Sequence, residues 1–334
     1  MSVDAHLSRA WTALGEPAPS PAEAALPAVV ADALGPGRRL LAAIDVARVA
    51  EGADLLAAEG LRALPLLRPS MDQEADEAMA DVVPYLAELD PAGPVARRLF
   101  TARPGVDPRS GTMHLWPANP ATLLVTPAPA EAVRDHLRRF AKPPDRRGHR
   151  RYVRLWDPVV MVDYLRDIDA VTPFLRALTT GLGAPLTILA RQGDAMLRAE
   201  ATDAPCDVAP EAVLEAPDVR ALTLRLRRDF HAELTARVAA RFERNGRDVE
   251  PERLDRVSWR AMAAMERPRP GDAPTLDDHA KLVGVLMLMQ DDAHEDVLTG
   301  PVMRNEHIRH RERVEIVARS YVTALRRLAG RDVV

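Results

Sequence analysis

The last third of the sequence gathers the residue types that bind divalent metal ions. Its histidines and carboxylates fall in three groups: Asp277, Asp278 and His279, then Asp291, Asp292, His294, Glu295 and Asp296, and then Glu306, His307 and His310. A metal-dependent enzyme that uses these ligand types is one candidate function. The groups also fit ordinary helical structure, because acidic residues favour a helix's first turn and the arginines around the last histidines oppose metal binding. We favour the structural interpretation and expect no metal and no cofactor.

Other signatures of enzymes are missing from the sequence. It has no G-x-S-x-G elbow, no Walker phosphate loop and no dinucleotide-binding glycine fingerprint at a strand-to-helix junction. Cys206 is the only cysteine, which excludes an internal disulfide and a thiolate zinc cluster. We therefore expect a protein that is not an enzyme.

Charge and hydropathy narrow the range of partners. The 45 basic and 49 acidic side chains leave a formal net charge of -4, which gives no general attraction to nucleic acid. The longest strongly apolar run, Leu282–Met289, is far too short to cross a bilayer, and residues 1–11 lack the pattern of a secretion signal. We expect a cytoplasmic protein that neither binds nucleic acid nor inserts into a membrane.

Prolines, turn residues and apolar runs divide the first two thirds of the chain into elements. Residues 1–38 predict a short helix and then a linker rich in proline and alanine. Short apolar runs bounded by turn residues predict strands at Leu40–Asp45, Leu61–Leu67, Val82–Leu86, Ala121–Thr126, Tyr152–Trp156, Pro185–Arg191 and Ala195–Ala199. Helical spacing between several of these runs indicates an α/β (α+β) lobe with a mixed sheet over residues 39–205.

Residues 206–334 have the pattern of an all-helical lobe. Apolar side chains recur every four residues at Leu222, Leu226, Phe230, Leu234, Val238 and Phe242, which predicts one long amphipathic helix. Similar spacing predicts a second helix from Val314 to Leu328, with Leu282–Met289 as a buried helix between them.

Four segments of the first lobe carry a resemblance to a known family. In chain order they are Leu41–Arg48, Val83–Leu89, Ala132–Phe140 and Tyr152–Val160. Together they resemble the domain shared by the adaptor chaperones of bacterial type VI secretion, which has been catalogued as a domain of unknown function. The resemblance covers residues 39–199, and the helical lobe fits the family only loosely.

Candidate residues for the family motif or for partner binding follow from this resemblance: Asp45, Pro84, Tyr85, His136, Arg154, Trp156, Asp157 and Pro158. Asp157 and Pro158 also fit a helix start, since aspartate caps free amide groups and proline at the first position gives up a donor that has no partner there. Arg154 lies beside aromatic residues, where it either pairs with a carboxylate of the lobe or anchors a partner. Strand alternation predicts that Tyr152, Arg154 and Trp156 share one face.

A basic region surrounds Lys142. It consists of three arginine pairs, Arg138-Arg139, Arg146-Arg147 and Arg150-Arg151. Such a region suits either a solvated turn or an acidic segment of a partner.

The resemblance implies a function without catalysis or a cofactor. An adaptor of this family binds a cognate secreted effector protein and the spike (valine-glycine repeat) protein, and it assists loading of the effector onto the spike. The metal-dependent enzyme and a generic protein-interaction scaffold are the alternatives. We also expect the lobes to divide the work, with the first lobe common to the family and the helical lobe adapted to this chain's own partner.

Overall fold

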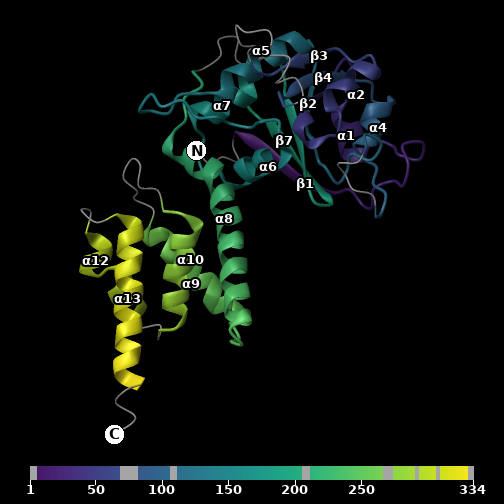
Figure 1. Ribbon diagram of the computed structural model, residues 1–334. Helices are drawn as coiled ribbons and strands as arrows, with labels where there is room; N and C mark the ends of the chain where they lie inside the picture. Colours follow the sequence, from purple (N-terminus) through teal and green to yellow (C-terminus); the bar gives the residue numbers. More distant parts are fainter. Residues whose placement is uncertain are drawn as a thin grey trace, which may run out of the picture. The chain divides into compact units, whose positions relative to one another are not determined.

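A computed structural model of the chain describes residues 6–67, 82–105, 111–204, 211–265, 274–289, 293–305 and 309–329. The chain divides into two units, Met1–Arg225 and Leu226–Val334. The first unit combines a sheet with helices and the second is helical, which confirms the predicted α/β lobe followed by a helical lobe (Figure 1). The boundary lies inside one long helix, later in the chain than the boundary expected at residue 206.

The first unit contains the strands and most of the shorter helices. In chain order its elements are β1 (Leu7–Ala13), α1 (Ala28–Ala33), β2 (Arg39–Ile44), the 3-10 helix η2 (Val46–Arg48), α2 (Gly52–Ala58), β3 (Ala63–Pro65), β4 (Tyr85–Leu89), α4 (Pro94–Arg98), β5 (Ala121–Thr126), α5 (Ala130–Ala141), α6 (Pro158–Asp167), α7 (Pro173–Thr180), β6 (Thr187–Gln192), β7 (Ala195–Ala201) and the start of α8 (Ala216–Arg244). The structure has a strand at each predicted position except Tyr152–Trp156, which belongs to no strand, although β4 begins three residues later than the predicted Val82–Leu86.

The sheet has seven strands in the order β1-β7-β6-β5-β2-β4-β3, and every neighbouring pair is antiparallel. The expectation of a mixed sheet is therefore wrong. The central strands β2 and β5 are buried along nearly their whole length because both of their faces are covered, a pattern more typical of parallel sheets. Antiparallel neighbours need no crossover helix of fixed hand, so strands separated by helices along the chain can pair in this way.

Strand β1 stands where a helix was expected within residues 1–38. Leu7–Ala13 pairs along its whole length with β7, with Trp11 opposite Leu197. His6 fixes the start of the strand, since its ring nitrogens lie 2.7 Å from Asp203 Oδ2 and 3.0 Å from Thr179 Oγ1. Pairing with a strand far along the chain outweighs the weak local pattern.

Alternation along the strands sends side chains into two cores, one on each face of the sheet. Leu41 and Ala43 of β2 pack with α5, α6 and α7 on one face. Leu40, Ala42 and Ile44 pack with α1, α2 and α4 on the other. The first unit is therefore a three-layer sandwich, and the sheet between its helical layers positions the candidate site (Figure 1).

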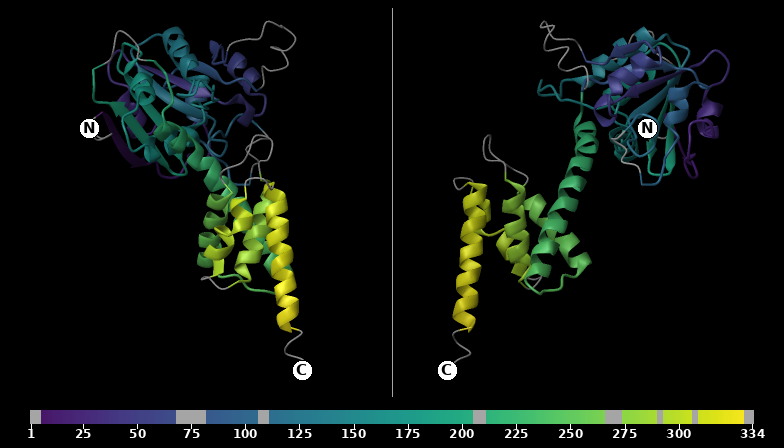
Figure 2. Two further views of the ribbon diagram at one scale, coloured as in Figure 1. Left: turned by 90° about the vertical axis from the view of Figure 1, so that its left-hand side faces the viewer. Right: turned by 45° about the vertical axis from the view of Figure 1, so that its right-hand side comes forward.

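The second unit packs helices alongside one another (Figure 2). Its elements are the rest of α8, then α9 (Pro251–Ala264), α10 (Leu276–Met287), α11 (Ala293–Leu298), α12 (Pro301–Arg304) and α13 (His310–Ala329). Leu234 and Val238 of the predicted apolar stripe are fully buried, whereas Phe230 and Phe242 are partly buried against the same core. No helix in the described ranges combines the length and the apolar character that crossing a membrane requires.

Candidate partner-binding site

One end of the sheet brings candidate residues together from distant parts of the chain. Asp45 directly follows β2, and Tyr85 opens β4 opposite Ile44. The amide of Asp45 donates a hydrogen bond of 2.8 Å to the carbonyl of Pro120, just before β5. The antiparallel register therefore places the ends of β2, β4 and β5 side by side.

Four charged side chains form a closed group at this end, which we call the Asp-Arg cluster: Asp45, Arg48, Arg154 and Asp157. Both carboxylates are buried. Arg154 Nη2 lies 2.5 Å from Asp45 Oδ2 and 3.6 Å from Asp157 Oδ2. Arg48 Nη2 lies 2.8 Å from Asp157 Oδ2, and its Nε lies 3.5 Å from Asp45 Oδ2. Each carboxylate thus contacts both guanidinium groups, and the formal charges cancel within the cluster.

The cluster fastens the segment between α5 and α6 to the end of the sheet. A buried carboxylate without a cationic partner costs about several kcal/mol, so the two aspartates favour the arrangement that keeps both arginines in place. Arg48 also donates a hydrogen bond of 3.2 Å to the carbonyl of Asn119. Charge-assisted bonds of this kind are about twice as strong as neutral ones and fix the geometry.

Asp157 starts helix α6 as well as closing the cluster. Its Oδ1 accepts a hydrogen bond of 3.1 Å from the amide of Val159, and the buried Pro158 occupies the first helical position. The predicted helix start is confirmed. Because Oδ1 caps the helix and Oδ2 contacts Arg48, one carboxylate couples the start of α6 to the sheet.

The segment before α6 forms no strand, and it turns at Leu155 and Trp156. Tyr152 and Arg154 have side chains that are 51% and 44% exposed, whereas Val153 and Leu155 are buried. Trp156 is only 3% exposed, because the chain turns there to begin α6. The expectation that Trp156 shares a face with Tyr152 and Arg154 is therefore wrong, although its ring lies edge-on to Tyr152 at 5.6 Å.

Tyr152 connects the cluster to a second cationic group. Lys142 Nζ lies 5.9 Å from the centre of its ring, a cation–π distance. Burial raises the pKa of Tyr152, and the positive charge of Arg154 partly offsets that rise. The phenol is therefore a neutral donor at physiological pH, placed between two positive side chains.

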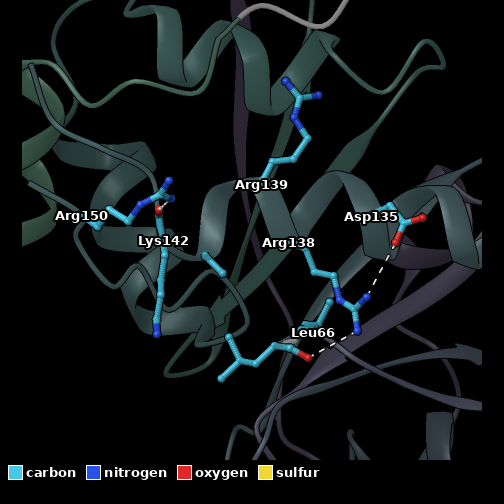
Figure 3. Close-up of a pocket in the computed structure, with 8 residues that line it drawn as sticks. Leu66, Asp135, Arg138, Arg139, Lys142 and Arg150 are labelled. Carbon is cyan, nitrogen blue, oxygen red and sulfur yellow. Dashed lines mark hydrogen bonds and ion pairs between the residues drawn. The ribbon is translucent and has the colours of Figure 1, made fainter. Parts of the chain in front are cut away.

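A basic hollow lies beside α5 and the end of β3, at the same end of the sheet (Figure 3). Its volume is about 720 Å³. Its lining consists of Leu66, Leu67, Asp135, Arg138, Arg139, Ala141, Lys142 and Arg150. Four cations face one carboxylate over a partly apolar floor, so the hollow favours a negatively charged ligand.

Arg138 has a structural task within this hollow. It donates hydrogen bonds to the carbonyls of Pro65, at 2.8 Å, and Leu67, at 3.3 Å, and so covers the open edge of β3. Figure 3 shows Arg138 beside Asp135 on one side of the hollow, with Lys142 and Arg150 on the other.

Other candidate residues support the site from the interior. His136 is buried, and its Nε2 lies 2.9 Å from the carbonyl of Leu178, so the ring carries its proton there. Burial lowers the pKa of His136 to about 4, which keeps the ring neutral. The carbonyl of Pro84 accepts a hydrogen bond of 2.8 Å from the amide of Leu66, and Tyr85 packs half-buried against the core.

Several site residues were not selected from the sequence. Arg48 follows Asp45 by three residues, a spacing that suits an ion pair across a helical turn and could have identified it. Asn119 has φ of 43°, a left-handed conformation that asparagine tolerates, and its Nδ2 donates 2.9 Å to the carbonyl of Arg191. Arg191 lies 3.9 Å over the ring of Trp116, and burial lowers its pKa to about 10. The contacts of Asn119 and Arg191 depend on strand register and leave no local pattern in the sequence.

The suggested metal ligands have separate partners where they are described. Asp278 and Thr275 form a capping box at the start of α10, His279 Nδ1 lies 2.9 Å from the carbonyl of Thr275, and His294 Nε2 lies 2.6 Å from the carbonyl of Leu286. The described residues exclude Cys206, Asp291, Asp292, Glu306 and His307, and the side chains of Glu295 and His310. In the described part of the chain, no three His, Cys, Asp or Glu side chains are grouped to hold a metal ion.

Comparison with protein families gives one match. A family model described as a domain of unknown function (DUF4123) matches residues 44–172. Those residues include the whole Asp-Arg cluster and every lining residue of the basic hollow, whereas the second unit lies outside them. Neither the curated proteins nor the solved structures contain a match to this chain.

Proposed function

We propose that this protein is a non-enzymatic adaptor of bacterial type VI secretion. It binds a cognate effector in the cytoplasm and assists loading of that effector onto the spike (valine-glycine repeat) protein. The DUF4123 domain is known in type VI secretion adaptors, and the match over residues 44–172 supports the proposal.

The Asp-Arg cluster is the observation that carries the proposal to this chain. Two of the family-like segments meet in it, since Asp45 comes from the first and Arg154 and Asp157 from the fourth. Its two buried carboxylates are neutralised by the two arginines and hold the segment before α6 against the end of the sheet. Arg154 of the cluster forms a row with Tyr152 and Lys142, in which Arg154 and Tyr152 are about half-exposed. Arginine and tyrosine are enriched among the residues that contribute most to protein interfaces, so this row suits partner binding.

Co-expression with the product of the adjacent effector gene tests the adaptor function. We expect the effector to become more soluble and to co-purify with this protein. In a strain that lacks this protein, we expect the effector to be lost from the spike and from the secreted fraction. An effector that is equally soluble, spike-associated and secreted in that strain would show that the proposed function is wrong.

A further inference from the structure

The second unit contains a long groove between α8, α10 and α13. Two adjoining hollows of about 530 and 480 Å³ share Val238, Arg241, Ala280 and Lys281, so they form one continuous depression. We call it the helical groove. It lies within the unit that begins at Leu226 and outside the residues that match the family model.

The floor of the helical groove is apolar and contains a gap. Ala280, Gly284 and Leu288 recur every four residues, which lines them up along α10. A Cβ atom on Gly284 would meet no atom within 4 Å beyond its chain neighbours and the nearby backbone of its own helix, so the space above the glycine is open. Phe242 of α8 and Tyr321 of α13 form walls on the two sides.

The rim of the helical groove is strongly basic. Six cations outnumber the two carboxylates, Asp277 and Asp278, that line it: Arg237, Arg241, Arg244, Arg247, Lys281 and Arg311. Arg237 and Lys281 are paired with acidic residues, at 2.8 Å and 2.5 Å. Arg241, Arg244 and Arg247 are exposed and make no ion pair with any described residue. One wall of an apolar groove therefore presents uncompensated positive charge.

We propose that the helical groove binds an acidic amphipathic helix of the effector. Apolar side chains of that helix cover the floor along α10, and its carboxylates meet the arginines that α8 presents. A peptide of this kind satisfies both parts of the groove, whereas a nucleic acid matches the charge but leaves the aliphatic floor uncovered. The inference rests on the proposed adaptor function and names the chemistry by which this chain recognises its own partner.

A labelled peptide tests the groove with the full chain. The probe is an amphipathic helix of about 20 residues, long enough to be helical, with leucine on one face and glutamate on the other. Gly284→Leu fills the gap in the floor, and Gly284→Ala is its matched control. We expect fluorescence anisotropy to show binding at least about tenfold weaker for Gly284→Leu and unchanged for Gly284→Ala.

Reversing a charge on the rim tests the helical groove independently, because it leaves the apolar floor unchanged. Arg241→Glu should weaken peptide binding by about tenfold, whereas Arg260→Glu, on an exposed position of α9 that lines neither hollow, should leave it unchanged. Failure of the wild-type chain to bind the peptide, or equal binding by wild type and both groove variants, overturns the inference. Tighter binding of single-stranded DNA, or a change of oligomeric state in Gly284→Leu, also overturns it, because these results identify a nucleic acid or a second copy as the occupant.

Co-purification with the effector separates this inference from the proposed function. If wild type and Gly284→Leu retain the effector equally, the groove is not its docking site and the adaptor function stands. If the wild-type chain retains no effector, the adaptor function fails, and with it the assignment of the groove to the effector.

Discussion

At the scale of single residues, Asp157 accepts a hydrogen bond from the Val159 amide with Oδ1 and one from Arg48 with Oδ2. Asp157→Ala removes the helix cap and leaves Arg48 without its closest carboxylate, at 2.8 Å. We expect the free energy of unfolding to fall by about 3 kcal/mol, of which the cap contributes about 1 kcal/mol. Asp157→Asn keeps a good cap and loses only the charge, so its loss should be about 2 kcal/mol. Urea unfolding of the two variants measures both contributions, and an unchanged stability in either one would contradict this account.

Arg154 can be compared directly with Arg166. Each guanidinium lies 2.5 Å from a buried carboxylate, and their side chains are 44% and 38% exposed. Replacement of either arginine by alanine should cost about 2 kcal/mol of stability, because each change leaves a buried carboxylate without its nearest cation although the arginine itself is partly solvated. We expect only Arg154→Ala to weaken effector binding, by about tenfold, because Arg154 lies in the row beside the cluster. Titration calorimetry with purified effector decides, and equal affinities for the two variants would remove Arg154 from the interface.

The neutral ring of His136 makes stability depend on pH. Its pKa is about 4 in the folded chain and 6.5 when unperturbed, so only the unfolded chain takes up a proton between these values. The stability is fully present above about pH 6.5 and falls as the pH drops towards 4. Between about pH 7.5 and 5, this residue should lower the free energy of unfolding by about 2 kcal/mol. His136→Leu should lose that part of the pH dependence in urea unfolding. A variant that keeps the wild-type pH dependence would show that His136 is not its cause.

At the scale of elements, two glycines with open space around them should respond oppositely to alanine. Gly193 turns the hairpin between β6 and β7 with φ of 62°, a conformation that strains other residues. Gly193→Ala should therefore destabilise the first unit by about 1 kcal/mol. Gly284 lies inside α10, where alanine is the better helix former, so Gly284→Ala should stabilise the second unit by up to about 1 kcal/mol. Thermal unfolding gives both signs, and shifts in the same direction would contradict the backbone argument.

Elements with a strong local period could be predicted from the sequence, and elements that depend on distant pairing could not. Ala121–Thr126 is a buried apolar run and forms β5 as predicted. Leu7–Ala13 forms a strand because β7 lies beside it. Tyr152–Trp156 alternates like a strand in sequence, but it turns at Leu155 and Trp156, and its Val153 amide bonds the carbonyl of Ala141 outside the sheet. A mixed and an antiparallel sheet also share the same apolar runs, so the strand direction was not available from them.

The residues of the candidate site could likewise be predicted from the sequence only in part. Asp45, Arg154 and Asp157 were selected from segments with a family pattern, and the structure brings them together. Asn119 joins them only through the register of β2 against β5, which no local spacing records, whereas the three-residue spacing from Asp45 could have identified Arg48.

At the scale of the whole chain, the first unit is completed by the start of α8. Asp218 is buried and accepts hydrogen bonds from the hydroxyls of Tyr164, at 2.7 Å, and Thr172, at 2.6 Å. Leu214 and Ala221 belong to the core that α5, α6 and α7 form on the sheet. The boundary expected at residue 206 thus precedes residues that belong structurally to the first unit.

Truncation tests this division of the chain. A chain that ends at Arg225 keeps Leu214, Asp218 and Ala221, whereas a chain that ends at Asp207 loses all three. Without Asp218, the hydroxyls of Tyr164 and Thr172 lose their buried acceptor. We expect the chain ending at Arg225 to unfold cooperatively in urea, and the shorter chain to be less stable by about 3 kcal/mol or more. Equal stability would place the start of α8 outside the first unit.

The chain ending at Arg225 also lacks the helical groove, so it should bind the effector more weakly than the full chain. Equal binding would mean that the Asp-Arg cluster and the basic hollow suffice, and that the two units do not share recognition.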